Sequence, residues 1–275
     1  MALPTISIIG MGNVGSALFK ACRAADYKIH TLYNRSESEL ASVHTGMPVH
    51  LKELGDLTFI TVSDQALGSV AESLSDLPGE WEGKCFVHCS GTLSSDVLNS
   101  LQNHGANIAS FHPMMSVKTD LSSFKNIYFD GEGDEICLSM LNELAGRLGA
   151  RFMEVDAADR KFLHAASVVA SNYLVTLAEV ASKIGERSGQ QKSEVLKAML
   201  PLMKSTLRNL QSGEPREALT GPIARGEKEV IEKHLSFLGK NEDDGEVYRL
   251  LGRLTLGLVD EKTRKKLSAL FEDEK

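Results

Sequence analysis

The chain has 275 residues, of which 42% are hydrophobic and 24% charged, so it can bury a sizeable core and is long enough for one large or two ordinary domains. Its 30 Lys and Arg residues against 37 Asp and Glu residues give a formal net charge of −7, which argues against nucleic-acid binding or a broad contact with an anionic membrane and favours small-molecule partners. Its four cysteines form no disulfide-rich framework or complete zinc site, no apolar run approaches the roughly 20 residues of a membrane span, and no signal peptide is evident, so we expect a cytoplasmic protein without a metal centre.

The first half of the chain alternates short β-branched runs with helical stretches, as expected of βαβ units over a parallel sheet. The predicted strands are residues 5–9, 28–33, 57–62, 85–88, 107–111 and 126–129. Residues 135–148 then predict a helix, which Gly149 ends in the usual C-terminal position. The fold class expected here is α/β, with a doubly wound parallel sheet.

A glycine-rich motif follows the first predicted strand directly. Gly10, Gly12 and Gly15 form G-x-G-x-x-G, with Asn13 and Val14 between the last two glycines. In the dinucleotide-binding Rossmann fold, the first glycine permits a tight turn, the second lets a pyrophosphate approach bare backbone, and the third lets the helix pack on the strand. The context therefore favours a bound dinucleotide over an ordinary glycine-rich turn.

The end of the second predicted strand indicates which dinucleotide binds. An NAD enzyme places an acidic residue there, about 20 residues beyond the fingerprint, whereas this chain has Asn34, Arg35 and Ser36. The planar guanidinium of Arg35 suits an adenosine 2′-phosphate, because it can make two charge-assisted hydrogen bonds. NADP(H) is therefore favoured over NAD(H), the alternative being that Arg35 merely points into solvent.

Further polar residues follow the later strands, whose ends point into the ligand crevice of a doubly wound sheet. Ser63 and Asp64 are expected near the nicotinamide side of the cofactor. Ser90 and Gly91 offer a hydroxyl and amides to a substrate oxyanion or, alternatively, cap a helix. His112 lies beside a proline at a strand end and is a candidate proton donor, with a structural histidine bonded to backbone as the alternative.

Beyond residue 156 the apolar residues recur with a helical period and β-branched runs are few. This pattern predicts a Rossmann domain over residues 1–153 and an all-helical substrate and dimerisation domain over 154–275. Apolar positions in the predicted helices 194–210 and 247–258 exceed what one side of a small domain needs to cover. We therefore expect a homodimer with an apolar interface.

The predicted helix 159–184 is apolar on nearly every side, so we expect it to be buried at the domain junction. At about 100° per residue, Lys161, His164, Ser171 and Asn172 share one broad polar face. His164 is the first choice as proton donor and Lys161 the second, while Ser171 and Asn172 would orient the substrate. Alternatively, these groups hydrogen-bond neighbouring helices.

The loop that contains Thr220 and Arg225 precedes the predicted helix 227–238. Exposed amides and Arg225 can receive an anionic substrate there, most simply a carboxylate. Alternatively, the loop forms a turn and Arg225 pairs with an acidic neighbour.

Four motifs carry a resemblance to a known family. They are Gly-Met-Gly-Asn-Val-Gly at 10–15 with Asn-Arg-Ser at 34–36, Phe-His-Pro-Met at 111–114, His-Ala-Ala-Ser-Val-Val-Ala-Ser-Asn at 164–172, and Leu-Thr-Gly-Pro-Ile-Ala-Arg-Gly at 219–226. With them the chain resembles, over nearly its whole length, Rossmann-like proteins of unknown function related to pyrroline-5-carboxylate reductase and the 6-phosphogluconate dehydrogenase superfamily. The resemblance implies a two-domain NADP-dependent oxidoreductase, with its active site in the cleft between domains and a homodimer formed through the helical domain.

Two departures limit what the resemblance implies. The Ser, Gly and Thr-rich loop by which pyrroline-5-carboxylate reductases hold a carboxylate is absent. β-Hydroxyacid dehydrogenases of the superfamily carry a catalytic Lys followed four residues later by Asn, whereas Ala165 stands four residues after Lys161. We therefore expect an NADP(H)-dependent oxidoreductase that transfers hydride to or from a small, anionic carbonyl or imine compound. The alternative is a non-catalytic NADP(H)-binding sensor or interaction protein.

Overall fold

The computed structural model of the chain separates into two compact units, Met1–Asn172 and Tyr173–Lys275. The residues that the structure describes are 3–37, 42–117, 121, 123–211, 213–239 and 243–272. The predicted boundary between residues 153 and 154 stays a prediction. The last strand ends at Glu154, whereas the first compact unit continues to Asn172.

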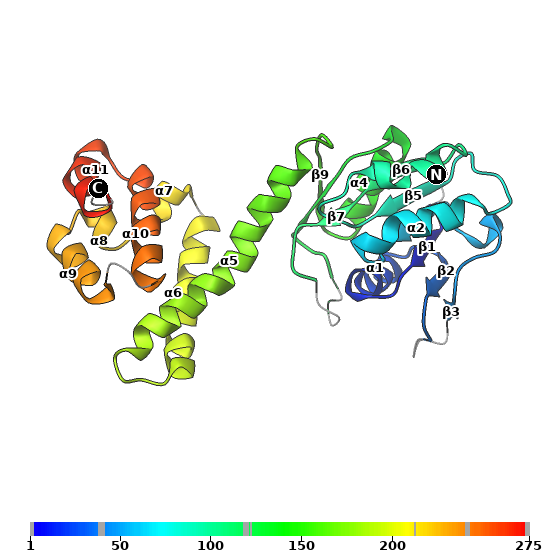
Figure 1. Cartoon of the computed structure of the whole chain (residues 1–275). Helices are drawn as coiled ribbons and strands as arrows, with labels where there is room; N and C mark the ends of the chain where they lie inside the picture. Colours follow the sequence, from blue (N-terminus) through cyan, green and yellow to red (C-terminus); the bar gives the residue numbers. More distant parts are fainter. Residues whose placement is uncertain are drawn as a thin grey trace. The chain divides into compact units, whose positions relative to one another are not determined.

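The first unit contains a six-stranded parallel sheet in the order β3-β2-β1-β4-β5-β6 (Figure 1). Its strands are β1 (Ile6–Ile9), β2 (Ile29–Asn34), β3 (Val43–Thr45), β4 (Leu57–Ile60), β5 (Cys85–His88) and β6 (Asn107–Ser110). This strand order is that of the Rossmann fold and confirms the predicted doubly wound α/β class. The added strand β3 has only three residues, too few for a recognisable pattern.

Helices cover both faces of this sheet. On one face, α1 (Asn13–Ala24) and α4 (Glu135–Arg147) share a core with Ile6 and Ile8. On the other face, α2 (Asp64–Ser75) and α3 (Asn99–Gln102) pack with Ile9. The alternation of apolar side chains along β1 thus supplies both cores, as expected of a sheet buried on both sides.

A small second sheet adjoins the carboxyl end of β6. It consists of β7 (His112–Pro113), β8 (Tyr128–Gly131) and β9 (Arg151–Glu154), with β7 antiparallel and β9 parallel to β8. The predicted strand 126–129 therefore begins two residues late, since Asn126 has a φ of +66°. The sequence did not predict β9, because its mostly exposed residues lack an apolar run.

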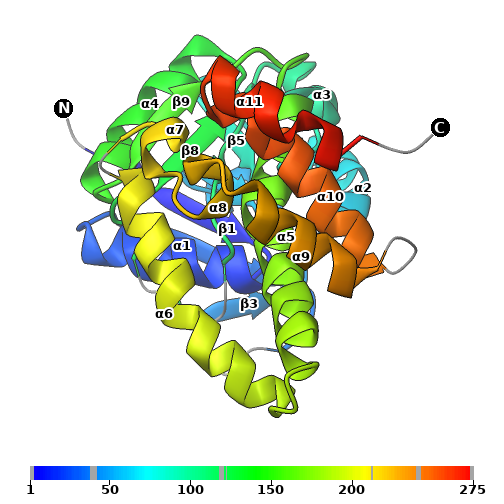
Figure 2. The ribbon, with the colours of Figure 1, turned by 90° about the vertical axis from the view of Figure 1, so that its left-hand side faces the viewer.

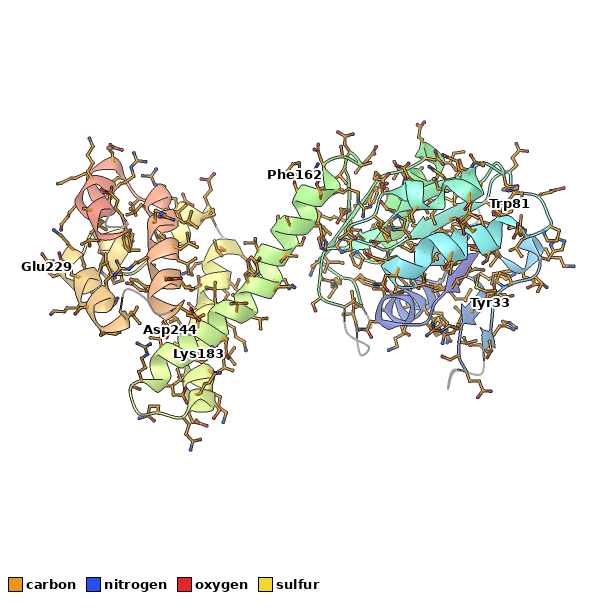
Figure 3. All side chains as sticks on the ribbon, in the orientation of Figure 1. Tyr33, Trp81, Phe162, Lys183, Glu229 and Asp244 are labelled. Carbon is orange, nitrogen blue, oxygen red and sulfur yellow. The ribbon has the colours of Figure 1, made fainter. Side chains whose placement is uncertain are left out.

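Helix α5 (Arg160–Glu186) forms where a helix is predicted, but it is not buried as expected. Phe162, labelled in Figure 3, is 66% exposed and Val175 is 71% exposed on a single chain. By length and composition α5 also meets the requirements for a membrane-spanning helix, contrary to the expectation that no segment comes near them. This is weak support for a membrane role, since core helices of soluble proteins meet the same requirements.

The second unit has helices as its only regular secondary structure in the described residues, as predicted (Figure 2). After the end of α5 it contains α6 (Lys192–Gln211), α7 (Pro215–Ala218), α8 (Pro222–Arg225), α9 (Lys228–Leu238), α10 (Asp243–Thr255) and α11 (Glu261–Leu267). Its core is small and consists of Ile231, Leu235, Leu256, Leu267 and Phe271. Much of the apolar surface of its helices is therefore left exposed on one chain.

Candidate functional site

The glycine-rich turn between β1 and α1 packs against the end of β4. Gly10 has a φ of +101°, and a Cβ on it would lie 2.9 Å from the carbonyl carbon of Thr61. A Cβ on Gly15 would lie 2.0 Å from the carbonyl oxygen of Gly10 and 2.6 Å from the Thr61 hydroxyl. That hydroxyl donates a 2.5 Å hydrogen bond to the same carbonyl. Only glycine fits both positions without moving the helix away from the strand.

The amino end of α1 is open. Gly12 is its N-cap residue, no side chain caps the helix among the residues described, and a Cβ on Gly12 would meet no protein atom within 4 Å. Asn13 and Val14 begin the helix, and its first turn carries no acidic residue. Uncapped amides at the positive end of a helix dipole bind phosphate groups. This cradle therefore fits a pyrophosphate that approaches Gly12.

A cavity of about 470 Å³ lies between this turn and the ends of β2 and β4. Asn34 ties the end of β2 to the turn, because its carboxamide oxygen accepts the Met11 amide N–H at 3.2 Å and its nitrogen donates to the Ser36 carbonyl at 3.0 Å. Arg35 and Ser36 line the cavity, and its lining includes no acidic residue among those that the structure describes. The apolar part of the lining consists of Ile9, Met11, Met47, Val62, Ala66 and Val70. The cavity thus combines an apolar surface for a base with a cation suited to a phosphate.

Ser63 lines the same cavity, but its neighbour Asp64 is engaged elsewhere. A single oxygen of Asp64 accepts hydrogen bonds of 2.8 Å from the hydroxyls of both Ser90 and Thr92. The Ser90 hydroxyl in turn accepts the amide N–H groups of Thr92 and Leu93 at 3.2 Å. The Ser90 hydroxyl thus holds the path of its own loop and caps no described helix, since Ser94 is the N-cap of the next helical turn.

His88, the last residue of β5, hydrogen-bonds to two residues of the same loop. Its Nδ1 accepts the Ser90 amide N–H at 3.1 Å, and its Nε2 then donates to the Ser94 carbonyl, also at 3.1 Å. Burial, followed by the charge of Arg160, lowers the pKa of His88 to about 4. At neutral pH this ring is therefore uncharged, and it fixes the path of the loop that carries Ser90 and Gly91.

The short strand β7 places His112 opposite an acidic residue. In the antiparallel register of β7 and β8, His112 pairs with Asp130, and its Nδ1 donates a 2.8 Å hydrogen bond to Oδ2 of that carboxylate. The other oxygen, Oδ1, lies 3.4 Å from Nε of Arg160. Asp130 thus bridges an imidazole and a guanidinium.

Arg160 is buried at the start of α5, with 2% of its side chain exposed. Besides Asp130 it faces Glu132, whose Oε1 lies 3.5 Å from Nη1. It also donates hydrogen bonds to the carbonyl of Leu93 and, at 2.7 Å, to that of Ser90. A buried cation of this kind persists only when carboxylates and carbonyls surround it.

His164 follows Arg160 by one helical turn and meets His112 above Gly91. The two ring centroids are 6.1 Å apart. A Cβ on Gly91 would lie 2.8 Å from both Nε2 of His112 and Nδ1 of His164. The Nδ1 of His164 is buried and has no hydrogen-bond partner among the described residues. Two predicted proton donors and a predicted substrate-binding glycine therefore lie together.

The other candidates on α5 lie outside this cluster. The Lys161 ammonium lies 5.3 Å from the ring centroid of the exposed Phe162. Ser171 and Asn172 are exposed further along the helix.

The loop of the second unit has its own ion pair. Arg225 donates to both carboxylate oxygens of Glu227, at 2.7 and 2.9 Å, while Thr220 is exposed nearby in sequence. These contacts agree with the alternative in which Arg225 pairs with an acidic neighbour rather than with a substrate.

Sequence reasoning missed Asp130, Glu132 and Arg160. A signal existed, since two acidic residues follow a short apolar run at 128–129 and an arginine lies one helical turn before His164. No local pattern, however, tells a buried charge from an exposed one. Among the residues described, no group of three His, Cys, Asp or Glu side chains is placed to hold a metal ion.

Comparisons with known proteins place both parts of the chain. Residues 2–113 match the family model of a Rossmann-like domain, and residues 127–255 match a domain of unknown function, DUF2520. Among the curated proteins, none matches the chain.

Solved structures resemble the chain over most of its length. The "putative NADP oxidoreductase BF3122" from Bacteroides fragilis is 25% identical over 92% of this chain and 97% of that one, with a TM-score of 0.70. Protein TM1727 from Thermotoga maritima is 24% identical over 94% and 99%, with a TM-score of 0.74.

A pyrroline carboxylate reductase from Plasmodium falciparum, solved with NADP bound, shares the fold at 14% identity over 98% of both chains, with a TM-score of 0.59. The chain therefore combines a region that matches a Rossmann-like domain with a region that matches DUF2520, and it shares its fold with pyrroline-5-carboxylate reductases.

Proposed function

We propose that this protein is an NADP(H)-dependent oxidoreductase that acts on a small carbonyl or imine compound. The observation that carries the proposal is a single cavity that joins the open, uncapped amino end of α1 to Arg35. In this one compact unit, backbone amides are available for the pyrophosphate of NADP(H) and a guanidinium is available for its 2′-phosphate.

The residues fit the cofactor in two places. The turn 10–15 would hold the pyrophosphate through backbone amides, since the space at Gly12 is open. Arg35, with Asn34 and Ser36, would hold the adenosine 2′-phosphate, because its guanidinium lines the cavity and can make two charge-assisted hydrogen bonds. When bound, NADPH supplies a hydride to the substrate. Ser63 also lines the cavity, and its neighbour Asp64 bonds to Ser90 in the loop that carries Gly91.

An anionic substrate group remains part of the proposal. Thr220 and Arg225 are its proposed binding residues, with Lys161, Ser171 and Asn172 as further polar groups that can orient it. Because Glu227 already pairs with Arg225, a substrate carboxylate would have to displace that side chain. Both partners are exposed, so the ion pair costs little to break.

We further propose that the protein works in the cytoplasm as a homodimer. Its support is the exposed apolar surface of α6 and α10 on a single chain. The residues are Leu196, Leu200, Leu202, Leu207 and Leu210 on α6, and Leu250, Leu251 and Leu254 on α10. A second copy that covers them would remove a large apolar area from water.

The deciding experiment has two arms. Calorimetry measures the dissociation constants of NADPH and NADH, and absorbance at the nicotinamide band follows NADPH oxidation with a panel of keto acids, imino acids, aldehydes and ketones. We expect tighter binding of NADPH and turnover with at least one compound. Tight binding without turnover would support the nucleotide sensor instead, and failure of both nucleotides to bind would refute the proposal altogether.

A further inference from the structure

We infer that His112 and His164 form a paired-imidazole site that holds and protonates the reacting oxygen or nitrogen of the substrate, and that Asp130, fixed by Arg160, sets the orientation of His112. The inference rests on the proposed reductase function and adds the identity of its proton donor. Its substrate class is a compound whose carbonyl oxygen or imine nitrogen can hydrogen-bond to a nitrogen of each ring.

The first observation is the convergence of two ring nitrogens. Nε2 of His112 and Nδ1 of His164 lie 2.8 Å from the same point beside Gly91, close enough for one small polar group to reach both. A Cβ on Gly91 would be too close to both rings, so only glycine lets the two imidazoles approach this backbone and each other.

The second observation is the state of each nitrogen. Nδ1 of His164 is buried without a partner in the described part of the chain, and such an atom loses free energy unless a ligand or water satisfies it. In His112, Nδ1 bonds to Asp130, while Nε2 has no hydrogen bond to the residues that the structure describes. Because a carboxylate only accepts, Asp130 requires the proton on Nδ1 of His112. Nε2 is then the nitrogen that exchanges a proton with the substrate.

The third observation is that Arg160 links Asp130, the loop that carries Gly91 and the helix that carries His164. It holds Asp130 from the side opposite His112 and binds the Ser90 carbonyl in the loop that carries Gly91. It also begins the helix on which His164 lies one turn later. Apolar side chains of similar volume can stabilise a fold as well as a buried ion network does, so the network is better explained by the geometry that it imposes.

These contacts define the proton transfer. In its protonated form His112 donates the Nε2 proton to the substrate oxygen or nitrogen, which takes the electron pair of its double bond to carbon. The carbon receives the hydride of NADPH, which is oxidised to NADP⁺, and His112 is left neutral until it regains a proton from solvent. His164 can donate a hydrogen bond from Nδ1 to the same substrate atom, which stabilises its developing negative charge. This arrangement ranks His112 ahead of both His164 and Lys161 as the proton donor.

The test replaces Asp130 with asparagine. Arg160 only donates hydrogen bonds, so the carboxamide oxygen of the variant should stay with Arg160 and its NH₂ should face His112. Nδ1 of His112 must then accept, which moves its proton to Nε2 and disfavours the doubly protonated ring. We expect ¹⁵N NMR of histidine-labelled protein to show this tautomer change. Turnover should fall roughly 10²- to 10⁴-fold, with NADPH affinity unchanged.

Glu132→Gln is the matched control. It makes the same carboxylate-to-carboxamide change beside Arg160, but Glu132 bonds to Ser95 and Ser110 and not to His112. The His112 tautomer should therefore stay that of the parent protein. An unchanged tautomer in Asp130→Asn, or a changed tautomer with full turnover, would overturn the inference.

A second variant guards against a folding defect in the first. Gly91→Ala places a methyl group 2.8 Å from a nitrogen of each ring without requiring a positive φ. The rings must then move apart, which should lower turnover at least 10²-fold while NADPH binds normally. Gly146→Ala on α4, where a Cβ meets no atom within 4 Å, is its control. Full turnover in Gly91→Ala would overturn the inference. If the parent protein binds NADPH but reduces nothing in the panel, the proposed reductase function fails first.

Discussion

The two glycines Gly12 and Gly15 of the fingerprint should respond in opposite ways to the same added methyl group. In Gly15→Ala the Cβ would lie 2.0 Å from the Gly10 carbonyl oxygen and 2.6 Å from the Thr61 hydroxyl. Backbone cannot yield as a flexible side chain can, so α1 must move away from the sheet. In Gly12→Ala the Cβ meets no protein atom within 4 Å, and its φ of −72° suits alanine.

The magnitudes follow from these contacts. Overpacking of a close contact costs about 1–3 kcal/mol or more, so Gly15→Ala should lower the melting temperature by roughly 2–4 °C for each kcal/mol lost. Gly12→Ala should change the free energy of unfolding by less than about 1 kcal/mol, the scale of an N-cap substitution. Its methyl group would, however, hold the pyrophosphate off the helix amides. Losing one charged hydrogen bond of about 1.5–3 kcal/mol would weaken NADPH binding roughly 10- to 150-fold.

Two measurements separate the effects. Differential scanning calorimetry without nucleotide gives the stability of each variant, and isothermal titration gives its affinity for NADPH. The expected pattern is a destabilised Gly15→Ala and a stable Gly12→Ala that binds poorly. If Gly12→Ala binds NADPH as tightly as the parent protein, the cofactor does not approach Gly12 and the assignment of the cradle is wrong.

Three further predictions concern the cofactor, pH and assembly. Arg35→Ala should weaken NADPH binding by about 1.5–3 kcal/mol, the scale of a charged hydrogen bond, and barely affect NADH; equal losses by calorimetry would contradict the 2′-phosphate contact. Because the pKa of His88 falls from 6.5 in the unfolded chain to about 4 in the folded one, the unfolded chain binds more protons between these pH values. The lowered pKa of His88 therefore adds up to about 3 kcal/mol to the free energy of unfolding above pH 6.5, and this stability is lost as the pH falls toward 4. Denaturant titrations at several pH values should show a flatter pH dependence of stability in His88→Gln, and an unchanged slope would show that other groups cause it. Light scattering at micromolar concentration should give the mass of a dimer, and a monomer mass would end the homodimer proposal.

Several features of this protein follow from the sequence alone because they depend on local chemistry. The turn at 10–15 needs glycine for its backbone path, and the β-branched runs that flank it predict the order of strands and helices in the first unit. Cofactor preference rests on the absence of an acid at 34–36, which is also visible without a structure. The helical texture beyond residue 156 likewise predicts an all-helical second part, because the 3.6-residue period is a local property.

The tertiary structure alone decided which polar side chains meet. His112 and Asp130 are 18 residues apart in the chain, and only the antiparallel register of β7 and β8 places them opposite each other. Asp130 and Arg160 are 30 residues apart, and nothing in either local sequence marks them as buried. The same holds for Ser90, whose hydroxyl could bind a ligand or cap a loop until its hydrogen bonds to Asp64 and the loop amides are known. Side-chain pairing across a fold depends on strand register and on the path of connecting loops, and these are set by the packing of the whole unit rather than by any short segment.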